Sequence, residues 1–188
     1  MDNRSLLLDT ALRLFAQRGY DAVGVQEIVE TAGLTKPTLY HYFGNKLGLL
    51  IALLSERHAP LLQDLRAAAE YRGDLRLTLE RVLDTYLDYA TDNPTFYRFW
   101  LSLLFAPPRH ESAAVAARLF ARQQELLETL FREAARDHGN MRGRHARLAF
   151  TLSALVNGVV ALAHSGQADL GPGERRELLR QFSHGIYS

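Results

Sequence analysis

The sequence predicts an all-α protein of about nine helices, in which an N-terminal three-helix helix-turn-helix domain precedes a larger helical domain. Three observations support this fold class. Apolar residues recur with helical spacing along nearly the whole chain, and no stretch reads convincingly as a strand. Gly and Pro stand where such stretches end. Residues 32–46 combine a glycine turn with a short helix whose outward positions are aromatic, hydroxylated and basic.

Periodicity and capping residues define the expected helices in order. The first carries an apolar stripe and is closed by Gly19, Asn45 can cap the fourth, and Asp74 can cap the fifth. Residues 166–173 form a loop before the last helix. We expect helices over residues 7–19, 25–31, 35–43, 45 to beyond Pro60, 75–90, 95–105, 112–138, 144–165 and 174–186.

Two of these helices have unusual features. Pro60 removes a hydrogen bond to the carbonyl of Glu56, so we expect the fourth helix to be kinked or split there. The sixth helix, residues 95–105, has a single narrow polar stripe of Thr95, Arg98 and Ser102. A helix with so little polar surface must be surrounded by other elements.

Composition excludes several classes of protein. The 188 residues are 47% apolar, enough for a sizeable core, and contain no cysteine for a disulfide framework or a zinc finger. The first 20 residues lack a leader pattern, and the apolar run 148–163 is shorter than the roughly 20 residues of a membrane span. We therefore expect a cytoplasmic protein. Without an HExxH, GxSxG or Gly-rich phosphate motif, no enzyme, metal site or cofactor is predicted.

The segment 32–46 is typical of a helix-turn-helix. Gly33 tolerates the positive φ of the turn, and the Thr35 hydroxyl is expected to accept from the amide of Thr38. Leu39 and Phe43 would pack inward. The outward residues are then Lys36, Pro37, Thr38, Tyr40, His41 and Tyr42. Such a surface suits a DNA groove and its phosphates. The net charge of +1 gives no support from bulk basicity, but both lysines of the chain, Lys36 and Lys46, flank this helix.

Residues 8–50 resemble the N-terminal domain of the TetR family of bacterial transcription regulators. The matching residues are Ala11, Leu14-Phe15, Gly19-Tyr20, Val25, Ile28, Ala32-Gly33-Leu34-Thr35, Thr38-Leu39-Tyr40, Tyr42-Phe43, Lys46 and Leu49-Leu50. The resemblance implies a ligand-responsive repressor that binds a palindromic DNA operator as a homodimer. It also implies a DNA-binding domain over residues 1–46 and an effector-binding and dimerisation domain over 47–188.

The resemblance also implies roles for individual residues. Gln26, Lys36, Pro37 and Tyr40 would face base edges, and phosphates would be gripped by Thr38, His41, Tyr42 and Lys46, with Thr35 beside them. Each of three residues also has an alternative role. Tyr40 could be a packing residue, His41 a solvated surface residue and Lys46 a charge without a partner. Gly24 stands where the family commonly has Thr or Ser, so one phosphate contact is missing. Together with the balanced charge of residues 1–50, Gly24 leaves open a helical small-molecule-binding or interaction protein that no longer binds DNA.

The larger domain offers an effector cavity and a dimer face. The cavity is expected between the fourth and eighth helices, where aromatic residues cluster and two amides lie in apolar stripes; ordinary core is the alternative. Its predicted lining is Tyr86, Tyr89, Phe96, Trp100, Phe120, Gln123 and Asn157, with Leu61, Leu62 and Leu65 facing it. Small residues in the eighth helix and an amphipathic ninth helix predict a four-helix dimer interface of Ala154, Gly158, Ala161, Leu178, Leu179, Phe182 and Ile186.

Overall fold

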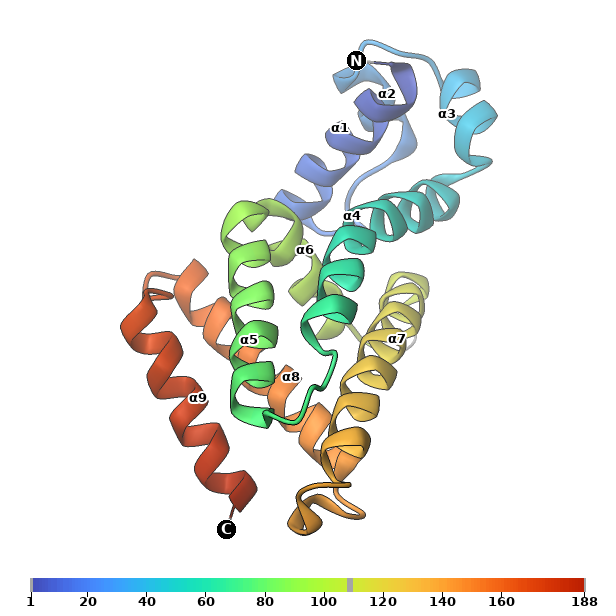
Figure 1. The fold of residues 1–188 in the computed structure, drawn as a ribbon. Coiled ribbons are helices and arrows are strands. Elements are labelled where there is room, and N and C mark those ends of the chain that lie inside the picture. Colours follow the sequence, from blue (N-terminus) through green and yellow to red (C-terminus); the bar gives the residue numbers. More distant parts are fainter. Residues whose placement is uncertain (1, 108–109, 188) are drawn as a thin grey trace. The chain divides into compact units, whose positions relative to one another are not determined.

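The computed structural model describes residues 2–107 and 110–187, with side chains through His184 in the last helix. Within these ranges the chain is all-α, as predicted, and contains no strand (Figure 1). The helices are α1 (Asn3–Arg18), α2 (Val25–Thr31), α3 (Lys36–Phe43), α4 (Lys46–Ala68), α5 (Leu75–Asp92), α6 (Pro94–Leu104), α7 (Glu111–Ala134), α8 (His145–His164) and α9 (Pro172–Tyr187), with a 3-10 turn at Gly139–Met141.

Side-chain capping explains where α4 and α5 begin. Asn45 Oδ1 accepts from the amide of Gly48 at 2.7 Å, and Asp74 Oδ1 accepts from that of Leu77 at 2.8 Å, as their positions predicted. The seventh helix ends at Ala134, four residues earlier than expected. After Ala135 the next three side chains are polar and cannot extend the buried face, and the backbone passes through tighter i→i+3 bonds into the 3-10 turn.

Pro60 lies inside α4, which continues across it, so of the two predicted alternatives, a kink or a split, the split is excluded. The proline instead marks the boundary between two compact units. The first unit comprises residues 1–59 and 93–119, and the second comprises residues 60–92 and 120–188. Both α4 and α7 therefore run from one unit into the other. These compact units do not coincide with the two functional domains predicted from the sequence, residues 1–46 and 47–188.

The first unit is built on α1, which packs against α2, α3 and α6. The Phe15 ring lies 5.3 Å from that of Tyr20 and 5.6 Å from that of Phe99, measured between centroids. The expectation that α6 is surrounded is confirmed. Its buried residues are Phe96, Tyr97, Phe99, Trp100, Leu101 and Leu103.

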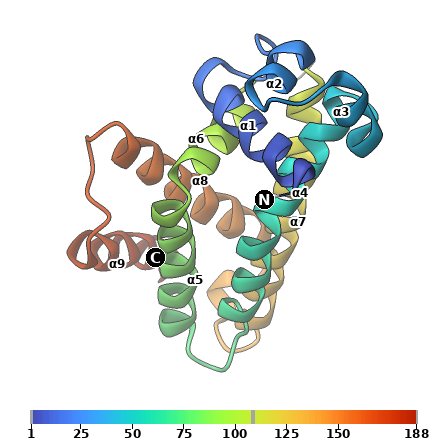
Figure 2. The same cartoon turned by 90° about the horizontal axis from the view of Figure 1, so that it is seen from above.

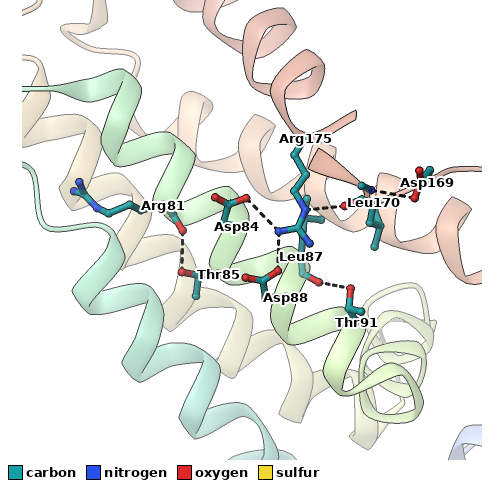
Figure 3. Close-up of polar contacts among 10 residues, drawn as sticks. Arg81, Asp84, Thr85, Leu87, Asp88, Thr91, Asp169, Leu170 and Arg175 are labelled. Atoms are coloured by element: carbon teal, nitrogen blue, oxygen red, sulfur yellow. Dashed lines mark hydrogen bonds and ion pairs between the residues drawn. The ribbon is translucent and has the colours of Figure 1, made fainter. Parts of the chain in front are cut away.

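In the second unit α5 packs against α8 and α9, and Figures 1 and 2 show α9 alongside α5. One arginine ties α9 to its neighbour (Figure 3). The Arg175 guanidinium donates to Asp88 Oδ1 at 2.7 Å and to Asp84 Oδ1 at 3.2 Å, and its Nε donates to the carbonyl of Leu170 at 2.7 Å. Because Arg175 is only 20% exposed, these charge-assisted bonds fix the start of α9 on α5.

Candidate nucleic-acid interface and effector residues

The turn before α3 has the predicted conformation but a different cap. Gly33 has φ +66, which favours glycine. The Thr35 hydroxyl contacts the Thr38 hydroxyl at 2.9 Å and makes no bond to a helix amide, so the predicted cap to the Thr38 backbone is wrong. The hydroxyl pair still brings Thr35 and Thr38 together at the start of α3.

The two faces of α3 differ sharply. Leu39 is fully buried, whereas Lys36, Pro37 and His41 are exposed. Two aromatic side chains on the outer face are also well exposed, Tyr40 at 46% and Tyr42 at 41%. Exposed aromatic groups on a short helix are uncommon unless they contact a partner. The outward placement of these residues therefore agrees with the sequence prediction, and Thr38 lies half-buried at the edge of the same face.

The aromatic row of α3 is ordered by its own neighbours. The rings of His41 and Tyr42 meet edge to face at 5.3 Å, and those of Tyr42 and Phe43 lie 6.0 Å apart. The Arg4 guanidinium of α1 lies 5.5 Å from the Phe43 ring. These contacts hold His41 and Tyr42 in place beside the exposed Tyr40, which gives the surface a defined shape before any partner binds.

Gln26 lies on the exposed side of α2, where its amide donates to the Glu30 carboxylate one turn along the same helix. Such an i, i+4 pair is a surface contact that a base could replace. The N-cap of α2 is Gly24, with no side-chain capping bond. The absence of a hydroxyl at this position follows directly from the sequence.

Lys46 lies against two aromatic rings. Its ammonium is 4.0 Å from the centroid of the Tyr20 ring and 6.0 Å from that of Phe15. Burial lowers the pKa of Lys46, and the charges of Asp21 and Glu111 oppose that shift. Lys46 therefore makes a cation–π contact and is not a partnerless charge, while its predicted contact with a phosphate stays a prediction.

Tyr20, Asp21 and Glu111 act on this lysine, and His110 contacts Asp21. Sequence reasoning did not single these residues out for a function. The Tyr20 hydroxyl donates to Glu111 Oε1 at 2.7 Å, and His110 Nδ1 lies 2.6 Å from Asp21 Oδ2. Some 90 residues of sequence separate the partners in each pair. No local spacing could have indicated that they meet.

The residues predicted to bind an effector fall into both compact units. Phe96 and Trp100 belong to the first, where the Trp100 ring lies 4.9 Å from that of the buried His58. The second unit brings two predicted residues together, since the Gln123 amide donates to the Tyr86 hydroxyl. Both side chains are almost completely buried, at 1% and 0% exposure. A buried amide and hydroxyl paired in an apolar region are typical of positions that orient a ligand or specify a core.

The other predicted effector residues of the second unit have different surroundings. Asn157 is buried in α8, and Tyr89 and Phe120 are half-buried. Beyond Pro60, Leu61 and Leu65 are buried, while Leu62 lines an open groove between the second halves of α4 and α7. The groove has a volume of about 580 Å³ and is lined by Leu62, Arg66, Ala69, Glu70, Arg122, Glu125, Leu126, Thr129, Leu130 and Glu133.

The predicted dimer residues of α8 are exposed. Ala154, Gly158 and Ala161 form one surface with Phe150, which is 60% exposed, and Leu162, which is 46% exposed. Among the described helices, α8 is long and apolar enough to cross a membrane by length and composition. Its most apolar 18 residues have a mean hydropathy of 1.6, and 39% of that stretch is buried. Core helices of soluble proteins share these properties, so they do not identify a membrane span.

The predicted dimer residues of α9 differ from those of α8. Leu179 and Phe182 are buried within the chain, and the Phe182 ring lies 6.2 Å from that of Phe131. Within this chain their side chains therefore leave little surface for a partner, and their predicted role in a dimer interface stays a prediction. Leu178 is half-buried. The side chain of Ile186 lies outside the described residues.

Comparison with known proteins decides the family. Residues 7–53 match the bacterial regulatory proteins of the tetR family, and residues 75–187 match the C-terminal domain of BetI-type transcriptional repressors. The chain belongs to the TetR family. It is a transcriptional regulator with a helix-turn-helix DNA-binding domain, as predicted, and its family is not one of enzymes.

Two transcriptional regulators match different shares of the chain. The transcriptional activator FasR of Mycolicibacterium smegmatis is 30% identical over 154 residues, which are 82% of this chain and 68% of the relative. The repressor ComR of Escherichia coli is 37% identical over 87 residues, 46% of this chain and 39% of the relative.

Solved structures share the fold. A transcriptional regulator from Pseudomonas aeruginosa PAO1 superposes with a TM-score of 0.83 and 19% identity, covering 98% of this chain and 89% of that one. The regulator FadR from Bacillus subtilis, in complex with stearoyl-CoA, has a TM-score of 0.79 and 17% identity, covering 95% and 96% of the two chains.

Proposed function

We propose that this TetR-family protein is a cytoplasmic repressor that binds a palindromic operator as a homodimer and is released by a small apolar effector. The observation that carries the DNA-binding part is the outer face of α3, where Lys36, Pro37, Tyr40, His41 and Tyr42 are exposed around the buried Leu39. A lysine can donate to guanine, Pro and Tyr can meet a thymine methyl, and hydroxyls suit phosphate oxygens.

The proposal places α3 in the major groove with α2 beside it. Gln26 would then exchange its bond to Glu30 for an adenine, the base that an amide pairs with bidentately. Lys36, at the first turn of α3, is placed to reach a base edge or a neighbouring phosphate. The alternative of a helical protein that no longer binds DNA rests on Gly24 and the balanced charge of the N-terminal residues, and the experiment below separates the two.

The test is fluorescence anisotropy with duplex DNA from upstream of the protein's own gene. We expect specific binding that weakens steeply as salt rises, since phosphate contacts release counterions. Lys36→Ala should weaken binding and flatten discrimination at one base pair by about 1–3 kcal/mol. Arg76→Ala, which removes an exposed cation from α5, is the control for total charge. A protein that binds no duplex, or a Lys36→Ala variant indistinguishable from the control, would contradict the proposal.

For the effector we propose a ligand that is largely apolar, oriented by the buried pair Gln123 and Tyr86. Support comes from the placement of this pair among buried aromatic and aliphatic side chains and from FadR of Bacillus subtilis, whose structure contains stearoyl-CoA. An apolar site with one or two fixed polar groups is the usual composition of a small-molecule pocket. Stearoyl-CoA is therefore the first probe.

We expect stearoyl-CoA to weaken operator binding by the wild-type protein and to have much less effect on Gln123→Leu. Gln124→Leu is the matched control, because the next glutamine along α7 donates to Ser153 Oγ at 2.6 Å instead. Equal responses of the two variants would remove Gln123 from the site. No response by the wild type to stearoyl-CoA would contradict the choice of an acyl-CoA.

A dimer is proposed because palindromic DNA requires two recognition helices related by a two-fold axis. The exposed apolar surface of α8, with its small residues Ala154, Gly158 and Ala161, supports this region as the interface. Small residues allow two helices to approach closely, and Phe150 and Leu162 would be covered at the same time. Leu179 and Phe182 would support α9 from inside rather than contact the partner.

A further inference from the structure

The first turn of α7 meets the N-terminal helices at one cluster of charged and aromatic groups. Glu111 accepts from the Tyr20 hydroxyl at 2.7 Å, and the Lys46 ammonium lies 4.0 Å from the centroid of the same tyrosine ring. Glu111 and Asp21 are the two carboxylates whose charges act on Lys46. All of these residues belong to the first compact unit.

The position of Lys46 in the chain is one where a phosphate would bind. Lys46 is the first residue of α4 and follows the cap Asn45, and helix N-termini favour anions through their free amides and dipole. It comes three residues after α3 ends, beside the proposed DNA-binding surface. A lysine has a long, flexible side chain, so its ammonium can leave the Tyr20 ring without moving the backbone.

We propose that Glu111 holds the Lys46 ammonium inward and competes with a DNA phosphate for it. The inference rests on the DNA-binding surface proposed above. One ammonium cannot lie over the Tyr20 ring and bind a DNA phosphate at the same time. The carboxylate of Glu111 therefore limits DNA affinity in this conformation, and Lys46 is a phosphate contact that the free protein withholds.

The same helix gives this competition a link to the rest of the molecule. The seventh helix is continuous from Glu111 to Ala134 and carries Gln123 twelve residues after Glu111, about 18 Å along the axis. A shift of α7 caused at Gln123 would move Glu111 relative to Tyr20 and Lys46. The first turn of α7 thus gives a route from the effector residues to the DNA-binding surface.

The test compares Glu111→Gln with the wild type by anisotropy at several salt concentrations. Gln still accepts from Tyr20 but carries no charge, so the fold should be kept. We expect operator binding to tighten a few-fold with little change in the log–log salt slope, because Lys46 reaches the phosphate in both complexes but Glu111 no longer competes for it. In a Lys46→Ala background the same substitution should leave the affinity unchanged. Glu125→Gln, on the exposed side of α7, controls for the loss of one negative charge.

An increase in affinity that persists without Lys46, or equals that of Glu125→Gln, would overturn the inference. So would unchanged affinity in Glu111→Gln. In either case the wild type still binds DNA, so the proposed function stands. Failure of the wild type to bind any duplex would contradict the proposed function, and the inference with it.

A second measurement observes the lysine directly. The chain has two lysines, so selective isotope labelling gives two sets of side-chain NMR signals, with the exposed Lys36 as the reference. We expect the ε-protons of Lys46 to be shifted upfield by the Tyr20 ring in the free protein and to lose that shift when operator DNA is added. Retention of the shift in the DNA complex would contradict the exchange.

Discussion

At the scale of single residues, Tyr20 has the largest pKa change whose causes the structure gives. Its ring is buried and its hydroxyl donates to Glu111, and both effects raise its pKa above the ordinary value of about 10. A group whose pKa is raised by folding contributes stability that is present below its unfolded pKa and is lost as the pH rises above it. Tyr20 therefore makes the native protein sensitive to alkaline pH.

We expect the melting temperature of the wild type to fall more between pH 9 and pH 11 than that of Tyr20→Phe, which has no hydroxyl to ionise. Thermal unfolding followed by circular dichroism measures both. Tyr40→Phe, which removes an exposed hydroxyl from α3, is the control and should behave like the wild type. Equal losses in the wild type and Tyr20→Phe would show that the Tyr20–Glu111 bond does not contribute at alkaline pH.

At the scale of elements, the junction of α3 and α4 depends on a missing side chain. A Cβ added to Gly48 would lie 1.9 Å from the carbonyl oxygen of Phe43, far inside van der Waals contact. Because the obstacle is backbone, the last turn of α3 or the start of α4 would have to move. Gly48 thus sets how closely the recognition helix approaches the helix that follows it.

Gly48→Ala should therefore lower both stability and operator affinity, although alanine is the better helix former by about 1 kcal/mol. Gly173→Ala is the matched control, because its Cβ at the start of α9 meets nothing within 4 Å and should be neutral or slightly stabilising. Urea unfolding and anisotropy measure the two effects. If Gly48→Ala gains stability as the control does, the close approach to Phe43 does not restrain the junction.

The helices were predictable because periodicity and caps are local properties. Asn45 and Asp74 cap α4 and α5 as their spacing indicated, and the outer face of α3 follows from Leu39 alone. Partners of an apolar or charged face are not local. The apolar stripe that contains Leu179 and Phe182 predicted that one face of α9 is buried. Whether that face packs inside the same chain or on a partner depends on tertiary contacts, which the spacing of residues in α9 does not reveal.

The inward turn of Lys46 is a further case of this kind. The position of Lys46 after Asn45 indicated a positive charge at the start of a helix. The orientation of its side chain depends on Tyr20 and on Glu111, which is 65 residues further along the chain. The Tyr20 ring and the two nearby carboxylates offset part of the hydration that the ammonium loses on burial. No spacing rule in the sequence relates these residues.

At the scale of the whole molecule, α4 and α7 each contribute to both compact units, with boundaries at Pro60 and after Leu119. Signals between an effector and DNA have to pass along such shared elements, since a coupling mechanism requires that both sites bias the same structure. In the proposed dimer, the spacing of two α3 helices would be the quantity that this coupling changes. DNA tolerates only spacings near one helical turn, about 34–36 Å.

The most direct test of a dimer that reads DNA through α3 is hydroxyl-radical footprinting on the DNA upstream of the protein's own gene. We expect two protected segments related by a two-fold axis, their centres about 10 base pairs or a multiple of that apart. Gly158→Leu, which forces α8 away from a partner, should lose this paired pattern while keeping its helical content. A single unpaired segment, no protection, or an unchanged paired footprint with Gly158→Leu would contradict the account.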